Sequence, residues 1–181
     1  IGHGQNKLVA FGGGHKSQGN SRVAARGLND HRIVLEDAAL LGEYSGWAQS
    51  IAPQLAKEFY DWQFEFGPTR EFFDGYARQK GMPLATLRRA LEAAQAGYIT
   101  EVFAGAAINW DLRYFEKRLH VGMVHDRINL PFKWYVGSYP EFERLVYAKL
   151  SEEIEDNGKL QAVFSAVRRV FNLDLQVTRS C

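Results

Sequence analysis

Apolar side chains recur every three or four residues through most of the chain, the spacing that places them on one face of an α-helix. The acidic pair Glu36 and Asp37 suits the first turn of a helix that begins near Val34. The first apolar stripe consists of Leu40, Leu41, Tyr44 and Trp47. The second consists of Ile51, Leu55, Phe59 and Trp62. Because proline is tolerated in a first helical turn, we expect a new helix to begin near Pro53 and to end around Phe66.

Glycine and proline residues interrupt this pattern and separate the next helices. Gly67 and Pro68 end the second helix and begin a short one, which stops at Gly81–Pro83. The long stripe that follows spans Leu84–Val102 and ends at Gly105. This stripe is rich in alanine and glycine, so either a flat ligand or a neighbouring helix could approach it closely.

The last part of the chain predicts three more helices. Asn109 is suited to cap a helix that leads into His125, and we expect the charged side of this helix to be solvated. Pro131 opens the following helix, and Pro140 is expected to kink or break it. Asn157-Gly158 indicates a turn before a final amphipathic helix. No segment shows the alternation typical of a strand, so the predicted fold class is all-α.

The first 32 residues differ from the rest, being polar and rich in glycine. We interpret residues 1–32 as an N-terminal extension and residues 33–175 as one domain, followed by a C-terminal end at 176–181. The extension contains three scattered histidines, which exposed positions explain better than a metal site. They are His3, His15 and His31.

Composition narrows the possible classes of function. Of the 181 residues, 46% are hydrophobic, which suits one domain with a sizeable core, and the formal net charge is only +1. No basic stripe stands out, so we expect no nucleic-acid partner. Cys181 is the single cysteine, which excludes an intramolecular disulfide and fits a cytoplasmic protein. No apolar run approaches the roughly 20 residues that span a bilayer, and no secretory signal is visible.

His125 is the residue with the most distinctive chemistry. It lies among apolar residues, so its imidazole is expected to face the interior. A neutral imidazole with an apolar wall can bind haem iron, but a lone histidine of this kind is more often a hydrogen-bonded core residue. The residue pattern alone therefore favours the core interpretation.

The sequence around His125 changes this balance. The run H-x-R-I-x-L-x-x-K-W-Y-x-G-x-Y, from His125 to Tyr139, resembles the proximal segment of the haem-binding globin domain of globin-coupled sensors. The segments Glu58–Asp61 (E-F-Y-D) and Phe103–Gly105 support the resemblance, which extends over about residues 35–173. The connections before Leu91 and before His125 are longer than in typical members and are similar to those of protoglobins, single-domain relatives with the same pocket.

The resemblance implies a globin-like helical sandwich, with haem b between the Leu84–Val102 helix and the helix of His125. His125 would be the iron ligand, and Tyr60 would face the opposite, distal side of the haem. The other residues expected around the cofactor are Phe73, Leu91, Ala94, Gln95, Met123, Ile128, Trp134 and Tyr135. His120 is the competing ligand, although five residues turn it well away from the face of His125. Two explanations for Arg113, Lys117 and Arg118 are equally good. These residues either pair with a haem propionate or belong to a solvated helix face.

The implied function is reversible binding of O2, and also of CO or NO, in a sensor domain that is not itself an enzyme. Tyr60 would hydrogen-bond the gas, and Tyr135 would respond to motion of His125. The signal would reach a homodimer interface through the last two long helices. In coupled sensors a transmitter module follows at about residue 175. The alternatives are a stand-alone protoglobin-like haem protein, for gas binding or for removal of NO or peroxide, and a helical interaction module without a cofactor.

Overall fold

The computed structural model describes residues 35–179, and all regular structure within this range is helical, which confirms the predicted fold class. The α-helices are α2 (Leu35–Glu43), α3 (Ser45–Glu65), α4 (Gly67–Gln79), α5 (Leu84–Ala104), α6 (Leu112–Arg127), α7 (Phe132–Glu153) and α8 (Asn157–Arg179). A short 3-10 helix, η1 (Gly105–Ile108), joins α5 to α6. The predicted extension at 1–32, with its three histidines, and Cys181 lie outside the described residues. Helix α8 continues to Arg179, across the predicted boundary after residue 175.

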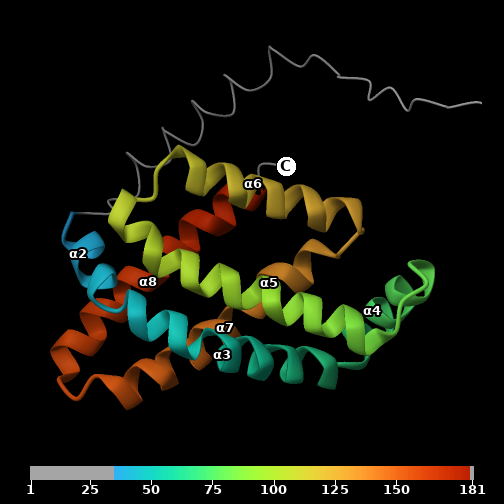
Figure 1. The fold of residues 1–181 in the computed structure, drawn as a ribbon, viewed down its shortest axis with the longest axis horizontal. Coiled ribbons are helices and arrows are strands. Elements are labelled where there is room, and N and C mark those ends of the chain that lie inside the picture. Colours follow the sequence, from blue (N-terminus) through green and yellow to red (C-terminus); the bar gives the residue numbers. More distant parts are fainter. Residues whose placement is uncertain (1–34, 180–181) are drawn as a thin grey trace, which may run out of the picture.

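The helices pack around a shared core. Helix α3 packs most extensively against α5, and α6 packs against α8. In Figure 1, α5 crosses the middle of the molecule between α3 below and α6 above. The apolar stripes predicted from the sequence supply the core, which includes Leu55, Phe59, Val102, Phe142 and Phe171. Because α6 is held mainly by α8, it stands apart from α5, and the space between these two helices becomes important below.

Two prolines lie inside helices that continue without interruption, although a helix was predicted to begin near Pro53 and a kink or a break was predicted at Pro140. Helix α3 begins at Ser45 and passes through Pro53, and α7 passes through Pro140 with no break. Both prolines are exposed. The carbonyl group that loses its helical hydrogen bond to each proline can therefore bind water, while the apolar faces of both helices remain packed.

Two predicted helix starts are also shifted. Asn109 adopts a left-handed conformation (φ 48°) at the end of η1, and Asp111 caps α6 by accepting a hydrogen bond from the Tyr114 backbone N–H at 3.1 Å. Asn157-Gly158 belongs to the first turn of α8 and not to the loop before it. The helix is capped one residue earlier, where the Asp156 side chain accepts a hydrogen bond from the Lys159 backbone N–H at 2.6 Å. In both places an aspartate side chain caps the helix: Asp111 takes the role predicted for Asn109, and Asp156 caps α8, for which no cap was predicted.

The corner between α5 and α6 needs glycine at position 105 because Trp110 lies so close to it. A Cβ atom at this position would lie 2.5 Å from Cδ1 of Trp110, closer than side chains approach one another. Trp110 is fully buried, and its indole N–H donates to the Val102 carbonyl oxygen at 2.9 Å. The glycine thus lets the indole close the corner and fixes where α6 begins.

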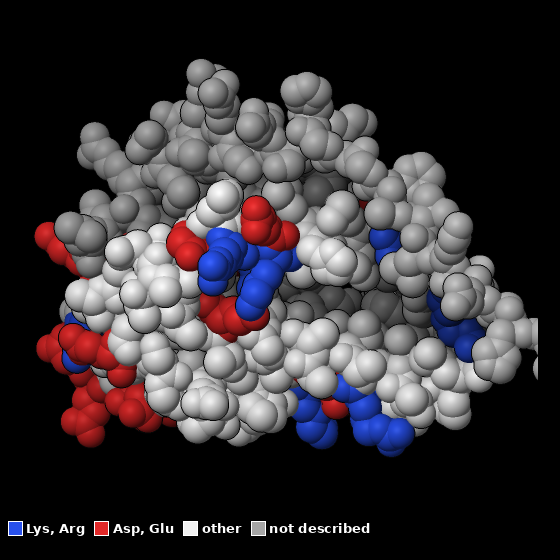
Figure 2. All heavy atoms as spheres, turned by 45° about the horizontal axis from the view of Figure 1, so that its top comes forward, with Lys and Arg blue, Asp and Glu red and all other residues white. Residues whose placement is uncertain are grey.

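The surface mixes charges of both signs. On the face in Figure 2, Lys and Arg side chains lie beside Asp and Glu side chains, next to a hollow and within largely uncharged surroundings. None of the described helices combines the length and the apolar character needed to cross a bilayer.

Candidate functional site

A cavity of about 330 Å³ lies between α5 and α6 and reaches inward to α3, α7 and α8. Its size is at the lower end of the roughly 300–1,000 Å³ of ligand pockets. Nine of the ten residues predicted to surround a cofactor line it. They are Tyr60, Phe73, Leu91, Ala94, Gln95, His125, Ile128, Trp134 and Tyr135. The structure thus brings together residues from five helices and one loop that are up to 75 positions apart.

Met123 is the predicted residue that lies elsewhere. Its side chain is 46% exposed and does not line the cavity. It precedes His125 by two residues, and two residues correspond to roughly 200° around an α-helix, so it points away when His125 points inward. We therefore leave it out of the candidate site.

His125 lies on the inner face of α6, one turn after Val121 and two turns after Arg118. Burial lowers the pKa of its imidazole, which favours the neutral form that can bind a metal. Its Nδ1 atom is buried and makes no hydrogen bond within the described part of the chain. The imidazole therefore lacks the partner that the core interpretation of this histidine would require.

Haem fits this arrangement. Within residues 35–179, no three His, Cys, Asp or Glu side chains converge to hold a metal ion. A porphyrin supplies four nitrogen ligands itself, so one protein imidazole and an apolar wall are enough for its iron. The wall here is largely aliphatic and aromatic, which suits a flat apolar ring.

Tyr60 reaches the cavity from α3. It is buried, and its ring packs edge-on against the ring of Phe59, with centroids 5.3 Å apart. Burial raises the pKa of the phenol above its ordinary value, so the hydroxyl keeps its proton. Among the described residues the hydroxyl has no hydrogen-bond partner, which leaves it available to a molecule in the cavity.

Tyr135 connects His125 to the last helix. The centroids of the His125 and Tyr135 rings are 4.8 Å apart. The Tyr135 hydroxyl donates to Thr178 Oγ1 at 3.2 Å and lies 3.0 Å from the Tyr139 hydroxyl. Thr178 in turn donates to the backbone carbonyl of Asp174 at 2.7 Å. A continuous series of contacts therefore leads from the imidazole to α8.

Trp134, the residue before Tyr135 in α7, packs against other aromatic rings. Its indole lies edge-on to Phe72, with centroids 5.9 Å apart, and to Phe66 at 6.4 Å. Phe73 is buried and stacks on Phe64 at 5.7 Å. Of these rings, Phe73 of α4 and Trp134 of α7 line the cavity.

A buried polar cluster next to the cavity was missed by the sequence interpretation. Asp174 is 1% exposed, and the hydroxyls of Tyr98 and Tyr114 both donate to its Oδ2 atom, at 2.9 Å and 2.8 Å. The guanidinium of Arg118 stacks over the same two rings, at 4.7 Å and 4.6 Å from their centroids. The available signal was position, because Asp174 follows Phe171 by three residues and so falls on the apolar stripe of the last helix.

Arg118 and His120 correct two predictions for α6. A solvated face was one of the two interpretations given for Arg118, and it is wrong, because Arg118 is 3% exposed, stacks on tyrosine rings and pairs with Glu101. His120 was expected to turn well away from His125 but lines the same cavity, although it is exposed. The cavity is wide enough that both the inner face and one flank of α6 border it.

The Asp174 cluster leads to a prediction about stability and pH. Burial raises the pKa of Asp174 from 3.8 to about 6, so the folded protein holds this proton more tightly than the unfolded chain does. Ionisation of Asp174 therefore opposes folding. Because of this group, the free energy of unfolding should fall by about 3 kcal/mol as the pH rises from about 4 through 6. Asp174→Asn removes the ionisation. We expect the variant to gain stability over the wild type by about 1–3 kcal/mol at pH 7.5 and much less at pH 4.5.

Chemical unfolding of both proteins at the two pH values measures this difference. Glu155→Gln removes an exposed carboxylate and serves as the control, with no pH-dependent difference expected. A stability difference for Asp174→Asn that is equal at pH 4.5 and pH 7.5 would contradict the prediction.

Comparisons with known proteins agree with this geometry. A family model described as Protoglobin matches residues 31–181. The globin domain of a Geobacter sulfurreducens globin-coupled sensor has the same fold, with a TM-score of 0.71 and 20% sequence identity, over 86% of this chain and 95% of that one. The structural match confirms the globin-like fold, and both findings confirm the resemblance recognised in the sequence. Because the family model covers most of the chain, this protein belongs to the protoglobin family, which implies that it binds haem and, through it, a diatomic gas.

Proposed function

We propose that this chain holds haem b through His125 and reversibly binds O2, and also CO or NO, as a sensor domain of the cytoplasm. The observation that carries the proposal is the imidazole of His125, which burial keeps neutral and which has a buried nitrogen without a partner inside an apolar cavity. A haem iron with one protein ligand supplies an open coordination position for a diatomic gas. Proteins of this kind are typically not catalytic, and we propose no enzymatic step.

Tyr60 is proposed to select between gases. Its protonated hydroxyl is a hydrogen-bond donor that faces the cavity from the side opposite α6. O2 gains negative charge when it binds, and CO gains much less, so the same donor stabilises O2 more strongly. Leu91 and Ala94 are proposed to line the same side, with Gln95 as a second donor.

Tyr135 is proposed to carry the signal out of the cavity. A displacement of the His125 ring would be felt by Tyr135, whose hydroxyl is bonded to Thr178 of α8. Helices α7 and α8 pack against each other, so a shift of Tyr135 reaches both. We propose that these two helices form a homodimer interface and that gas binding changes the strength of the dimer.

A titration of the haem-free protein with haemin tests the central proposal. We expect one equivalent to bind and to give a strong Soret band, and the reduced complex should change its visible spectrum on addition of CO. A protein that fails to take up haemin with a defined stoichiometry would end the proposal.

Tyr135→Phe tests the signalling route. The variant keeps the ring beside His125 but loses the hydroxyl contacts to Thr178 and Tyr139. If gas and dimer are coupled by about 1–3 kcal/mol, CO should change the wild-type dimer dissociation constant about 5- to 150-fold, and the variant should reduce this ratio towards one. Analytical ultracentrifugation with and without CO measures the ratio.

Thr178→Val should act in the same direction, because it removes the acceptor of the same hydrogen bond. Tyr147→Phe, on α7 but outside the cavity lining, is the control. An unchanged ratio in both Tyr135→Phe and Thr178→Val would exclude this route.

A second candidate is a haem protein that acts alone, in gas binding or in removal of NO or peroxide. The match to the protoglobin family model favours it. The ultracentrifugation experiment separates the two candidates, since a stand-alone protein should show the same dimer strength with and without CO.

A further inference from the structure

The charges around the cavity are distributed unequally. Arg118 is the one Lys, Arg, Asp or Glu among the described residues that line it. Arg118 and His120 both belong to the part of α6 that precedes His125, and both also line a second hollow. The cavity is therefore apolar at its inner end and has its cationic side chain next to this second hollow.

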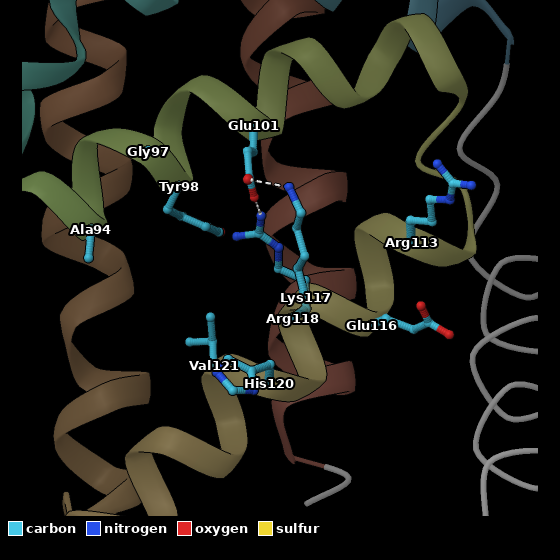
Figure 3. Close-up of a pocket in the computed structure, with 10 residues that line it drawn as sticks. All are labelled: Ala94, Gly97, Tyr98, Glu101, Arg113, Glu116, Lys117, Arg118, His120 and Val121. Carbon is cyan, nitrogen blue, oxygen red and sulfur yellow. Dashed lines mark hydrogen bonds and ion pairs between the residues drawn. The ribbon is translucent and has the colours of Figure 1, made fainter.

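The second hollow is a cleft of about 580 Å³ between α5 and α6, shown in Figure 3. It shares Ala94, Tyr98 and Val121 with the cavity in addition to Arg118 and His120, so the two spaces adjoin. We refer to it below as the α5–α6 cleft. The cleft and the cavity therefore lie next to each other between α5 and α6.

The α5 side of the cleft is open. Ala94 and Gly97 border it, and a Cβ atom built on Gly97 would meet no other atom within 4 Å. The α6 side carries the cations. Figure 3 shows that Lys117 and Arg118 extend from α6 towards Glu101 of α5, while Arg113 lies one turn before Lys117, at the start of α6.

The cleft has an excess of positive charge. Its lining contains Arg113, Lys117 and Arg118 against Glu101 and Glu116. Glu101 serves two cations at once, because it accepts from Lys117 at 2.7 Å and also pairs with Arg118. The Nε atom of buried Arg118 still lacks an acceptor within the described residues. One or more carboxylates could therefore join this cluster and find donors already in place.

Haem has the complementary shape and charge, since it is a flat apolar ring with two carboxylates on one edge. We propose that the carboxylate edge of the haem lies in the α5–α6 cleft, with Arg113 and Lys117 of α6 as its charge partners. This inference rests on the proposed function. It assigns an orientation to the cofactor: the apolar edge points to the aromatic end of the cavity near Phe73 and Trp134, and the carboxylates point to the cationic cleft.

The test compares haemin with its dimethyl ester, which has the same ring and iron but no negative charge on that edge. Equilibrium affinities of the haem-free full chain are measured through quenching of tryptophan fluorescence, since Trp134 lines the cavity. We expect the wild type to prefer haemin about tenfold, because each partly exposed ion pair contributes a factor of about two to five. Arg113→Gln/Lys117→Gln should weaken haemin binding by about that factor and leave ester binding unchanged.

The matched control removes one arginine and one lysine at the other end of the cavity. Arg127 ends α6 just after His125 and Lys133 lies in the first turn of α7, both of them exposed. Arg127→Gln/Lys133→Gln should keep the wild-type preference for haemin. Loss of preference in this pair, or its retention in Arg113→Gln/Lys117→Gln, would overturn the proposed orientation.

Two further measurements distinguish a wrong orientation of the haem from an unfolded variant. Gly97→Glu places a negative charge in the open part of the cleft and should weaken haemin binding while sparing the ester, even if the double variant proves unstable. Circular dichroism establishes that each variant is folded. A wild type that binds neither porphyrin contradicts the proposed function itself, whereas tight binding of both with no preference contradicts only the orientation.

Discussion

Replacing His125 with alanine should abolish the spectrum of a haem protein with a histidine-ligated iron and weaken haemin binding at least about a hundredfold. Loss of even a group that supports a metal ligand commonly costs 10- to 100-fold in metal affinity, and here the ligand itself is removed. In the described structure His125 has no hydrogen-bond partner for its buried nitrogen, so its removal breaks no internal hydrogen bond there. Absorption spectra and haemin titrations of the purified variant measure the effect.

His120→Ala provides the control, because it removes an imidazole that lines the same cavity from the same helix. It should bind haemin nearly as the wild type does and keep its coordination spectrum. The opposite pattern, in which His120→Ala loses the spectrum and His125→Ala retains it, would transfer the ligand role to His120. Imidazole added to His125→Ala should partly restore the spectrum if the cavity itself is intact.

Replacing Tyr60 with phenylalanine should increase the O2 dissociation rate constant about 10- to 150-fold while changing CO dissociation much less. The substitution removes only the hydroxyl, so the packing of the ring against Phe59 is kept. A hydrogen bond to a partly charged acceptor contributes about 1.5–3 kcal/mol, and about 1.4 kcal/mol corresponds to a factor of ten. Stopped-flow displacement of each gas gives the two rate constants.

The comparison between gases is what makes this prediction specific. A general opening of the cavity would speed the release of both gases, whereas loss of a donor acts mainly on O2. Gln95→Leu removes the second donor in the lining and should have a smaller effect. A large effect of Gln95→Leu together with normal O2 release from Tyr60→Phe would move the donor role to Gln95.

The sequence determined the helices wherever an apolar stripe was long and uninterrupted. Two such stripes form helices that face the core: the one with Leu55 and Phe59, and the one between Leu84 and Val102. The family was also recognisable from the sequence, because the residues from His125 to Tyr139 form a specific pattern. Periodicity alone favoured a core histidine at position 125, so the ligand hypothesis depended on that pattern.

Helix starts and proline positions depended on tertiary packing. Pro53 and Pro140 were expected to begin or interrupt helices, but each lies on the solvent side of a helix whose opposite face is buried. Packing of that face outweighs one lost hydrogen bond, since water can satisfy the exposed carbonyl group. The proline itself does not show which side of the helix will face solvent.

The burial of charged residues could not be predicted from the sequence, for a similar reason. A residue of Arg118's type on an amphipathic helix is usually solvated, and its burial depends on Tyr98 and Tyr114 being beside it and on Glu101 facing it. These partners come from other turns and another helix, and only the folded chain brings them together. The apolar stripes and the histidine pattern are local properties, so the sequence determined the helical fold and the candidate ligand. The sequence had given pairing with a haem propionate as one of two interpretations of Arg113, Lys117 and Arg118, which all belong to one helix. The cleft that these residues form with Glu101 and the buried Asp174 cluster both join side chains of different helices that pair with one another, so the tertiary structure decided them.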